Sequence, residues 1–220
     1  DLYDPTQVCL KESILANVAL IEAEEVIEDS NAISERFAAK AQSDVTKIKE
    51  VTIGFNQNML EMVKEGDHVD VESILCTFSD NLNDDMSGFS KEAAQTLYEL
   101  SSFSPQAGVR GHVDKIEVVY HGDPEDLTPS LKTLVNGKDR QRRKLANALG
   151  KDIPTSGSVN GDYRVDGVPL AYNTMCVKFY ITHRVDMAAA DKMVIANQLK
   201  TTVQELMRGE NYTERGEELD

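Results

Sequence analysis

Three long runs of strand-forming residues constrain the fold of this chain more than any other feature. They span residues 44–55, 109–120 and 170–182, and in the first two the apolar side chains alternate with polar ones. Successive side chains of a strand point to opposite faces of the sheet, so such runs predict half-buried strands. Shorter strands and two or three helices are expected between them. The sequence therefore predicts a mixed α+β, strand-rich fold of the barrel or sandwich kind.

A tight turn is expected at Gly66 and Asp67, between two short apolar strands within residues 59–78. Carrier domains of the lipoyl and biotinyl type have a similar turn and carry their cofactor on a lysine at the hairpin tip. Residues 67–78 contain no lysine. A carrier function is therefore disfavoured, and a structural sandwich with the same hairpin stays open.

Helical spacing of apolar residues predicts three helices, over residues 32–41, 90–101 and 130–149. Ser30 or Asn31 is expected to cap the first helix, and Gly150 is expected to end the last. The apolar run 13–21 is compatible with a buried strand or with a short helix, because its periodicity does not decide between them.

The chain is strongly acidic but contains one basic cluster. Its 23 Lys and Arg residues against 38 Asp and Glu residues give a net charge of −15, which disfavours autonomous binding of nucleic acid. Between Lys132 and Lys151 the balance is reversed, with Asp139 as the single acid among seven basic residues. These are Lys132, Lys138, Arg140, Arg142, Arg143, Lys144 and Lys151. The ordinary interpretation of such a cluster is a solvated helix face.

Several functional classes can be excluded. No run approaches ~18 uninterrupted apolar residues and no basic-then-apolar leader occurs, so we expect neither a membrane span nor a signal peptide. Cys9, Cys76 and Cys176 are far apart, which excludes a zinc ribbon or a disulfide scaffold and indicates a reducing compartment. There is no phosphate-binding loop, no zinc-protease motif and no evident nucleophile with its base. The chain alone is therefore not expected to hold a complete catalytic site.

Two pairs of charged residues are candidates for chemistry. Glu28 and Asp29 could lie near a metal ion or a phosphate, or could simply favour the start of the following helix through its dipole. Lys192 and Lys200, eight residues apart, could hold phosphates as mobile point charges, or could be ordinary surface lysines. The residues themselves leave these alternatives open.

Six short segments occur in an order that is typical of one protein family. They are 28–36, which contains an intact Ile-Ser-Glu-Arg, then 44–50, the Gly-Asp hairpin at 63–69, Gly-Val-Arg-Gly-His-Val at 108–113, 177–184 and Ala-Asp-Lys-Met at 190–193. In this order they resemble the C-terminal half of the beta subunit of multisubunit DNA-dependent RNA polymerases. The resemblance covers roughly residues 15–207, nearly the whole chain.

The resemblance implies a domain organisation. Residues 1–48 and 172–207 are expected to form part of a double-psi β-barrel. Residues 49–171 are expected to form a flap-like or wall-like insertion. Residues 208–220 are expected to be an acidic tail that continues into further sequence. The departures from the family and the small flap resemble the split subunits of giant bacteriophages, which implies the host cytoplasm or the virion as the location.

The resemblance also implies roles for particular residues. Lys192 and Lys200 are expected to contact the RNA 3′ end and nearby phosphates, and Glu28 and Asp29 to lie near the incoming nucleotide and the second magnesium ion. The helix 90–101, with Leu97 and Tyr98, corresponds to the flap-tip helix that docks promoter-specificity factors.

Because the family's catalytic aspartates belong to the other large subunit, magnesium is expected to be held mainly there. The chain is then expected to be one part of a nucleotidyltransferase, inactive alone. Its expected partners are a beta-prime-like subunit, the remaining beta-like parts, RNA and DNA.

The chain departs from the family at the loop before the second lysine. The family has glycines there, whereas residues 196–201 read Ala-Asn-Gln-Leu-Lys-Thr, so the backbone is expected to follow another path. The alternative function is a non-catalytic protein-interaction module with a β-sandwich core, in which the helices 90–101 and 130–149 dock a partner.

Overall fold

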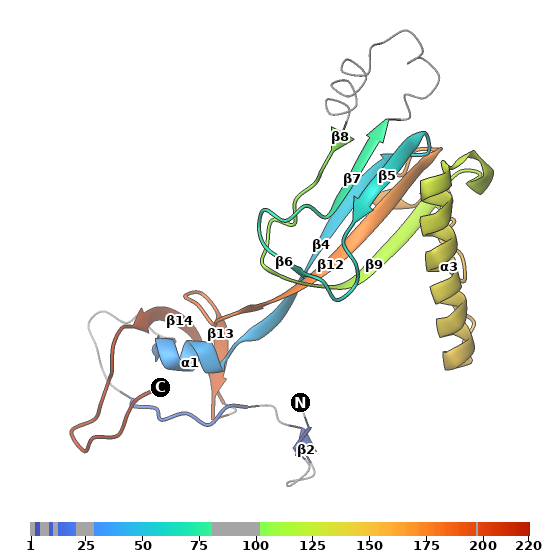
Figure 1. Cartoon of the computed structure of the whole chain (residues 1–220). Coiled ribbons are helices and arrows are strands. Elements are labelled where there is room, and N and C mark those ends of the chain that lie inside the picture. Colours follow the sequence, from blue (N-terminus) through green and yellow to red (C-terminus); the bar gives the residue numbers. More distant parts are fainter. Residues whose placement is uncertain (1–2, 5–8, 11–12, 21–28, 81–101, 197) are drawn as a thin grey trace. The chain divides into compact units, whose positions relative to one another are not determined.

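The computed structural model describes residues 3–4, 9–10, 13–20, 29–80, 102–196 and 198–220 (Figure 1). The chain divides into two compact units. The terminal unit is Asp1–Val45 together with Arg184–Asp220, and the inserted unit is Thr46–His183. The domain boundaries expected from the sequence, 1–48 with 172–207 around 49–171, stay a prediction. The chain is strand-rich and of mixed α/β type, with a curled half-barrel sheet and few helices in its described part.

The inserted unit is built on a four-stranded sheet in the order β4-β12-β9-β6. Its strands are β4 (Ser43–Gly54), β6 (His68–Val69), β9 (Gly111–His121) and β12 (Thr174–Val185). β12 runs antiparallel to β9, with a register shift between Tyr180 and Ile181. The three long strands predicted from the sequence are therefore confirmed as β4, β9 and β12.

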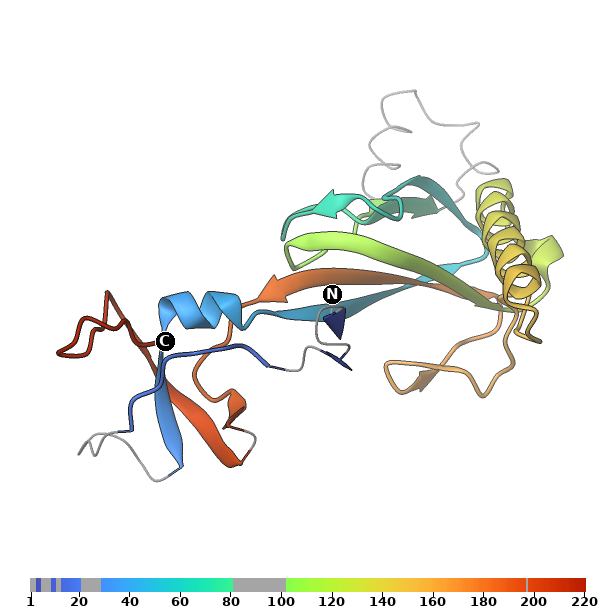
Figure 2. The same ribbon diagram turned by 90° about the horizontal axis from the view of Figure 1, so that it is seen from below.

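A second sheet forms a separate layer in the inserted unit (Figure 2). Its order is β5-β7-β8, and its strands are β5 (Gln57–Met62), β7 (Cys76–Asp80) and β8 (Ser102–Phe103). The predicted turn between β5 and β6 is confirmed: Gly66 has a φ of 95°, a left-handed backbone that glycine adopts without strain. Two small hairpins lie outside these two sheets, the first in the terminal unit and the second in the inserted unit. They are β1 (Tyr3–Asp4) with β2 (Cys9–Leu10), and β10 (Arg164–Val165) with β11 (Val168–Pro169).

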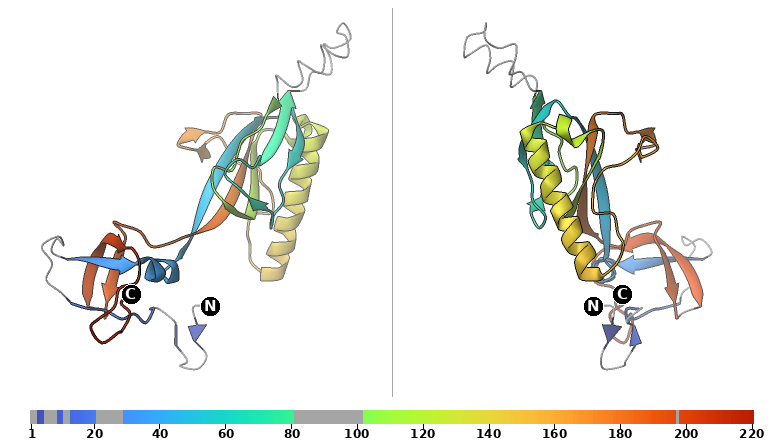
Figure 3. Two further views of the ribbon diagram at one scale, coloured as in Figure 1. Left: turned by 60° about the vertical axis from the view of Figure 1, so that its left-hand side comes forward. Right: turned by 90° about the vertical axis from the view of Figure 1, so that its right-hand side faces the viewer.

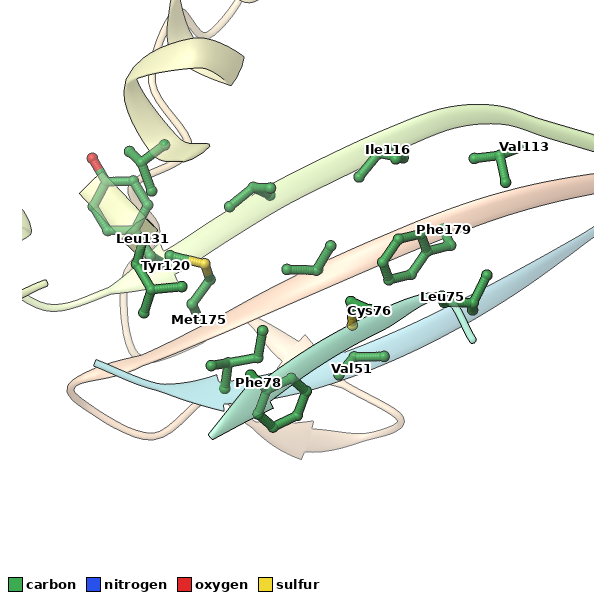
Figure 4. Packing of buried hydrophobic residues seen from close by; sticks show 14 of the residues in the cluster. Val51, Leu75, Cys76, Phe78, Val113, Ile116, Tyr120, Leu131, Met175 and Phe179 are labelled. Carbon is green, nitrogen blue, oxygen red and sulfur yellow. The ribbon is translucent and has the colours of Figure 1, made fainter. Parts of the chain in front are cut away.

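The core of the inserted unit lies between these layers. Phe179 of β12 faces Leu75 and Cys76, and Met175 lies closer to α3 (Figure 4). Phe179, Leu75 and Met175 are fully buried. Burial of each such side chain contributes about 1.5–3 kcal/mol, so this cluster is the main source of the unit's stability.

Among the described residues the longest helix is α3 (Pro129–Leu149), which follows the short 3-10 helix η2 (Pro124–Asp126). It confirms the helix predicted for residues 130–149. Pro129 occupies the first turn, where its missing N–H costs nothing, and Gly150 ends the helix with a φ of 60°. Leu131 and Val135 attach the first half of α3 to the core.

The terminal unit contains a three-stranded sheet in the order β13-β14-β3. Its strands are β3 (Ser30–Ser34), β13 (Lys192–Ile195) and β14 (Leu199–Met207). β13 and β14 form an antiparallel hairpin, whereas β14 and β3 are parallel although they lie far apart in the sequence. α1 (Glu35–Lys40) covers part of the sheet through a small core of Ile33, Phe37, Ala38 and Val203.

The start of the first helix was predicted wrongly. α1 begins at Glu35, and Ser34 caps it by accepting a hydrogen bond from the Phe37 N–H at 3.0 Å. Ser30 and Asn31, the expected caps, belong to β3 and pair with β14. The helix-dipole explanation for Glu28 and Asp29 is therefore removed, because no helix follows them directly. Residues 13–20 form neither a strand nor a helix, and helix 90–101 with Leu97 and Tyr98 lies outside the described residues.

Candidate functional site

The two candidate lysines lie on the same face of the β13–β14 hairpin. Lys192 pairs with Thr202, and Lys200 pairs with Val194. Directly opposed residues of antiparallel strands share a face, as do alternate residues of one strand. Lys192 and Lys200 are therefore diagonal neighbours, a relation that places residues roughly 7–8 Å apart. Both are exposed, and the side chain of neither forms an ion pair or hydrogen bond with another residue in the described ranges.

Asp29 lies directly beside the same sheet. It directly precedes β3, and its backbone carbonyl accepts a hydrogen bond from the Thr202 N–H at 3.0 Å. Since Thr202 pairs with Lys192 on one side and Ser30 on the other, Asp29 lies next to the row of residues that holds Lys192. Its φ of 62° is uncommon for a residue other than glycine.

The structure thus brings three predicted residues to one small sheet: Lys192 and Lys200 within it, and Asp29 at its edge. Glu28, Leu97 and Tyr98 lie outside the described residues. Two ammonium groups side by side without an acidic partner among the described side chains repel one another, and an anion that binds both relieves that repulsion. Lysine binds phosphate as a compact point charge, so this face is suited to phosphates.

The opposite face of the hairpin lines a cavity of about 400 Å³. The cavity is mainly apolar. Its lining includes Met193, Ile195, Leu199 and Thr201 of the hairpin, Ile33 and Phe37, and residues 16–20. The sequence alone does not predict this cavity. Met193, Val194 and Ile195 are three apolar residues in a row, so only the hairpin register separates the cavity face from the lysine face. No local pattern shows which distant segments form its other walls.

Two polar atoms of the cavity lining are buried without a hydrogen-bond partner in the described part of the chain. They are Thr201 Oγ1 and Asn31 Oδ1. Asn31 uses its amide nitrogen to donate to the Met193 sulfur, and Thr201 is only 4% exposed. Buried polar atoms normally have partners, so these two are exceptional among the described atoms that line the cavity.

The acidic segment 208–220 folds back on α1. Asp220 accepts hydrogen bonds from Arg36 at 2.7 Å, Lys40 at 3.1 Å and the Asn17 N–H at 3.1 Å, and Glu218 also pairs with Arg36. Burial acts to raise the pKa of Asp220, but these hydrogen bonds outweigh it and the pKa is lowered. Glu218 and Asp220 therefore pair with cations of α1, and they do not neutralise the two lysines of the hairpin.

No three His, Cys, Asp or Glu side chains within the described ranges are grouped so that they could hold a metal ion. Asp29 supplies a single carboxylate beside this sheet. No helix in the part of the chain that the structure describes is long and apolar enough to cross a membrane.

No protein-family model matches this chain, and no curated protein matches it. The interpretation of its function therefore depends on the ordered segments of the sequence and on the geometry of the hairpin.

Proposed function

We propose that this chain is part of the beta-like subunit of a multisubunit DNA-dependent RNA polymerase. In the assembled enzyme, Lys192 and Lys200 contact the phosphates of the RNA 3′ end, and Asp29 contributes to the neighbourhood of the incoming nucleotide. The observation that carries the proposal is the position of both lysines on one exposed face of the β13–β14 hairpin, with Asp29 directly beside the same sheet.

The chemistry of nucleotide addition explains why such a face is useful. Negative charge develops on the transferred phosphoryl group and its leaving group, and fixed cations stabilise that charge. Magnesium, when bound mainly by the partner subunit, would supply most of this charge stabilisation. Lys192 and Lys200 bind and orient the phosphates from this chain, which alone does not complete the catalytic centre.

The pairing of distant chain segments in the terminal unit supports the proposal. A double-psi barrel is closed by segments far apart in sequence, and β14 pairs in parallel with β3, the two strands coming from opposite ends of the chain. The inserted unit, which lies between them in the sequence, corresponds to the flap, and Leu97 and Tyr98 dock a promoter-specificity factor. Further barrel strands come from the remaining beta-like parts of the enzyme.

Co-purification tests the proposal most directly. An affinity-tagged full-length chain, purified from the cells that produce it and analysed by mass spectrometry, is expected to bring along a beta-prime-like subunit and other polymerase subunits. The Lys192→Gln/Lys200→Gln variant serves as a matched control, because exposed lysines of the site are not needed for assembly and it should capture the same set. Recovery of the chain with no polymerase subunit would contradict the proposal.

A further inference from the structure

The basic residues of α3 and its end fall into two groups. Three of them have acidic partners: Lys132 pairs with Glu125 at 3.2 Å, Lys138 with Glu65 at 2.7 Å and Arg142 with Asp139 at 3.0 Å. The other four have no acidic partner within the described ranges. These are Arg140, Arg143, Lys144 and Lys151. All four are exposed, so the second half of the helix carries free positive charge.

Helix geometry places these cations together. Each residue of an α-helix turns by about 100° and rises by about 1.5 Å, so Arg140, Arg143 and Lys144 lie on one face within about 6 Å along the axis. We refer to these three residues as the basic stripe. Lys151 follows just beyond Gly150 at the end of the helix. Leu131 and Val135, which enter the core, lie on the opposite face.

The second half of α3 extends beyond the core of its own unit (Figure 3). Leu145 and Leu149 continue the core-facing side of the helix, yet each is 53% exposed. A large ligand can therefore reach this part of the helix, since the described strands of the unit do not cover it.

The cations of the basic stripe lack the nearby acidic side chains that usually pair with basic residues on a helix surface. Like charges spaced three or four residues apart destabilise a helix by about 0.2–0.5 kcal/mol per pair. The only acid between Lys132 and Lys151 is Asp139, which is 7% exposed and accepts hydrogen bonds from Arg142 and from the Gly157 N–H, both at 3.0 Å. It cannot pair with the stripe, so the clustered cations cost stability until an anionic partner binds.

The net charge of −15 does not prevent such binding. Charges are screened over roughly 10 Å at 0.1 M salt, so a ligand at the stripe interacts mainly with the local cations and little with distant acids. Residues 129–151 contain no aromatic side chain. Single-stranded nucleic acids are usually held by stacking of bases on aromatic rings, which the stripe cannot provide. Contacts to a regular phosphate backbone need only exposed Arg and Lys.

We propose that the basic stripe of α3 binds the phosphate backbone of duplex DNA without reading its sequence. The site lies in the inserted unit and does not depend on the role given to Lys192 and Lys200 in the terminal unit. The sequence alone suggests that this helix face is simply solvated, whereas the proposal assigns it a DNA-binding role.

Binding of a fluorescently labelled duplex of random sequence to the full-length chain tests this inference. Fluorescence anisotropy is measured at several salt concentrations, from low salt up to about 0.2 M. The Arg140→Gln/Arg143→Gln/Lys144→Gln variant is expected to bind at least tenfold more weakly. Its slope of log affinity against log salt should be shallower by about three, because three phosphate contacts are lost.

A second variant controls for the general effect of removing three positive charges. Lys47→Gln/Lys64→Gln/Arg208→Gln removes the same charge from exposed positions elsewhere and should bind the duplex nearly as the unmodified chain does. Circular dichroism should show both variants folded. An equal loss in both variants, unchanged binding by the stripe variant, tighter binding of single-stranded RNA of equal length, or equally effective competition by polyglutamate would each overturn the proposal.

Discussion

Single residues of the β13–β14 hairpin carry the proposed contacts to RNA. Lys192→Gln and Lys200→Gln are each expected to lower the rate of nucleotide addition by the assembled polymerase by about tenfold or more, because a cation is lost beside developing phosphate charge. Single-turnover extension of a labelled RNA primer measures this rate. Arg208→Gln, which removes an exposed charge from the same unit, should leave the rate unchanged. Normal extension by both lysine variants, with assembly intact, would refute the assigned role.

Thr201 provides a second test at this scale. Its hydroxyl is buried, lines the cavity and has no hydrogen-bond partner among the described residues. Thr201→Val keeps the shape of the side chain and removes an unsatisfied group, so it should leave the free energy of unfolding unchanged or raise it by about 1 kcal/mol. Urea denaturation of the full-length chain measures this difference. A loss of more than about 1 kcal/mol would mean that the hydroxyl has a partner in solution.

Among the secondary-structure elements, α3 is joined to β9 through Glu65. The Glu65 carboxylate accepts hydrogen bonds from the Ile116 N–H at 2.9 Å and from Lys138 at 2.7 Å. Burial acts to raise the pKa of Glu65, but these two hydrogen bonds outweigh it, so its pKa lies below the ordinary 4.5. The stabilisation is therefore present above about pH 4.5 and is lost as the pH falls through the lowered pKa.

Glu65→Gln is accordingly expected to destabilise the chain by about 1 kcal/mol at pH 7, because a charge-assisted bridge between two elements is weakened. The difference from the unmodified chain should shrink as the pH is lowered below 4.5. Denaturation curves at several pH values measure it. Glu61→Gln, an exposed carboxyl on β5 without a described ion pair, is the control. A destabilisation that stays constant down to pH 3 would contradict the role of the Glu65 charge.

The elements that could be predicted are those specified by local pattern. The alternation in residues 44–55 and the spacing in 130–149 are properties of neighbouring residues, and both elements formed as expected. β3 was mistaken for the start of a helix because its partner, β14, lies far along the chain and only that pairing makes residues 30–34 extended. The shared face of Lys192 and Lys200 likewise requires the hairpin register, which the spacing of eight residues does not reveal.

At the scale of the whole molecule, the two units differ in how their cores are assembled. The core of the inserted unit is formed entirely by residues between Val51 and Ile181. The small core of the terminal unit combines Ile33 and Phe37 with Val203, so it requires both ends of the chain. The inserted unit should therefore fold without the terminal unit, since a domain with its own hydrophobic core is able to fold alone.

Residues 46–183 expressed alone are consequently expected to unfold in one cooperative transition in urea. Circular dichroism and tyrosine fluorescence measure this transition, since the chain contains no tryptophan. Leu75→Ala in this fragment should lower the free energy of unfolding by about 2–5 kcal/mol, because Leu75 is fully buried in its core. Val71→Ala, at an exposed position of the same unit, should change it by less than about 0.5 kcal/mol. A fragment that unfolds gradually, or that is equally insensitive to both substitutions, would show that its core depends on the chain ends after all.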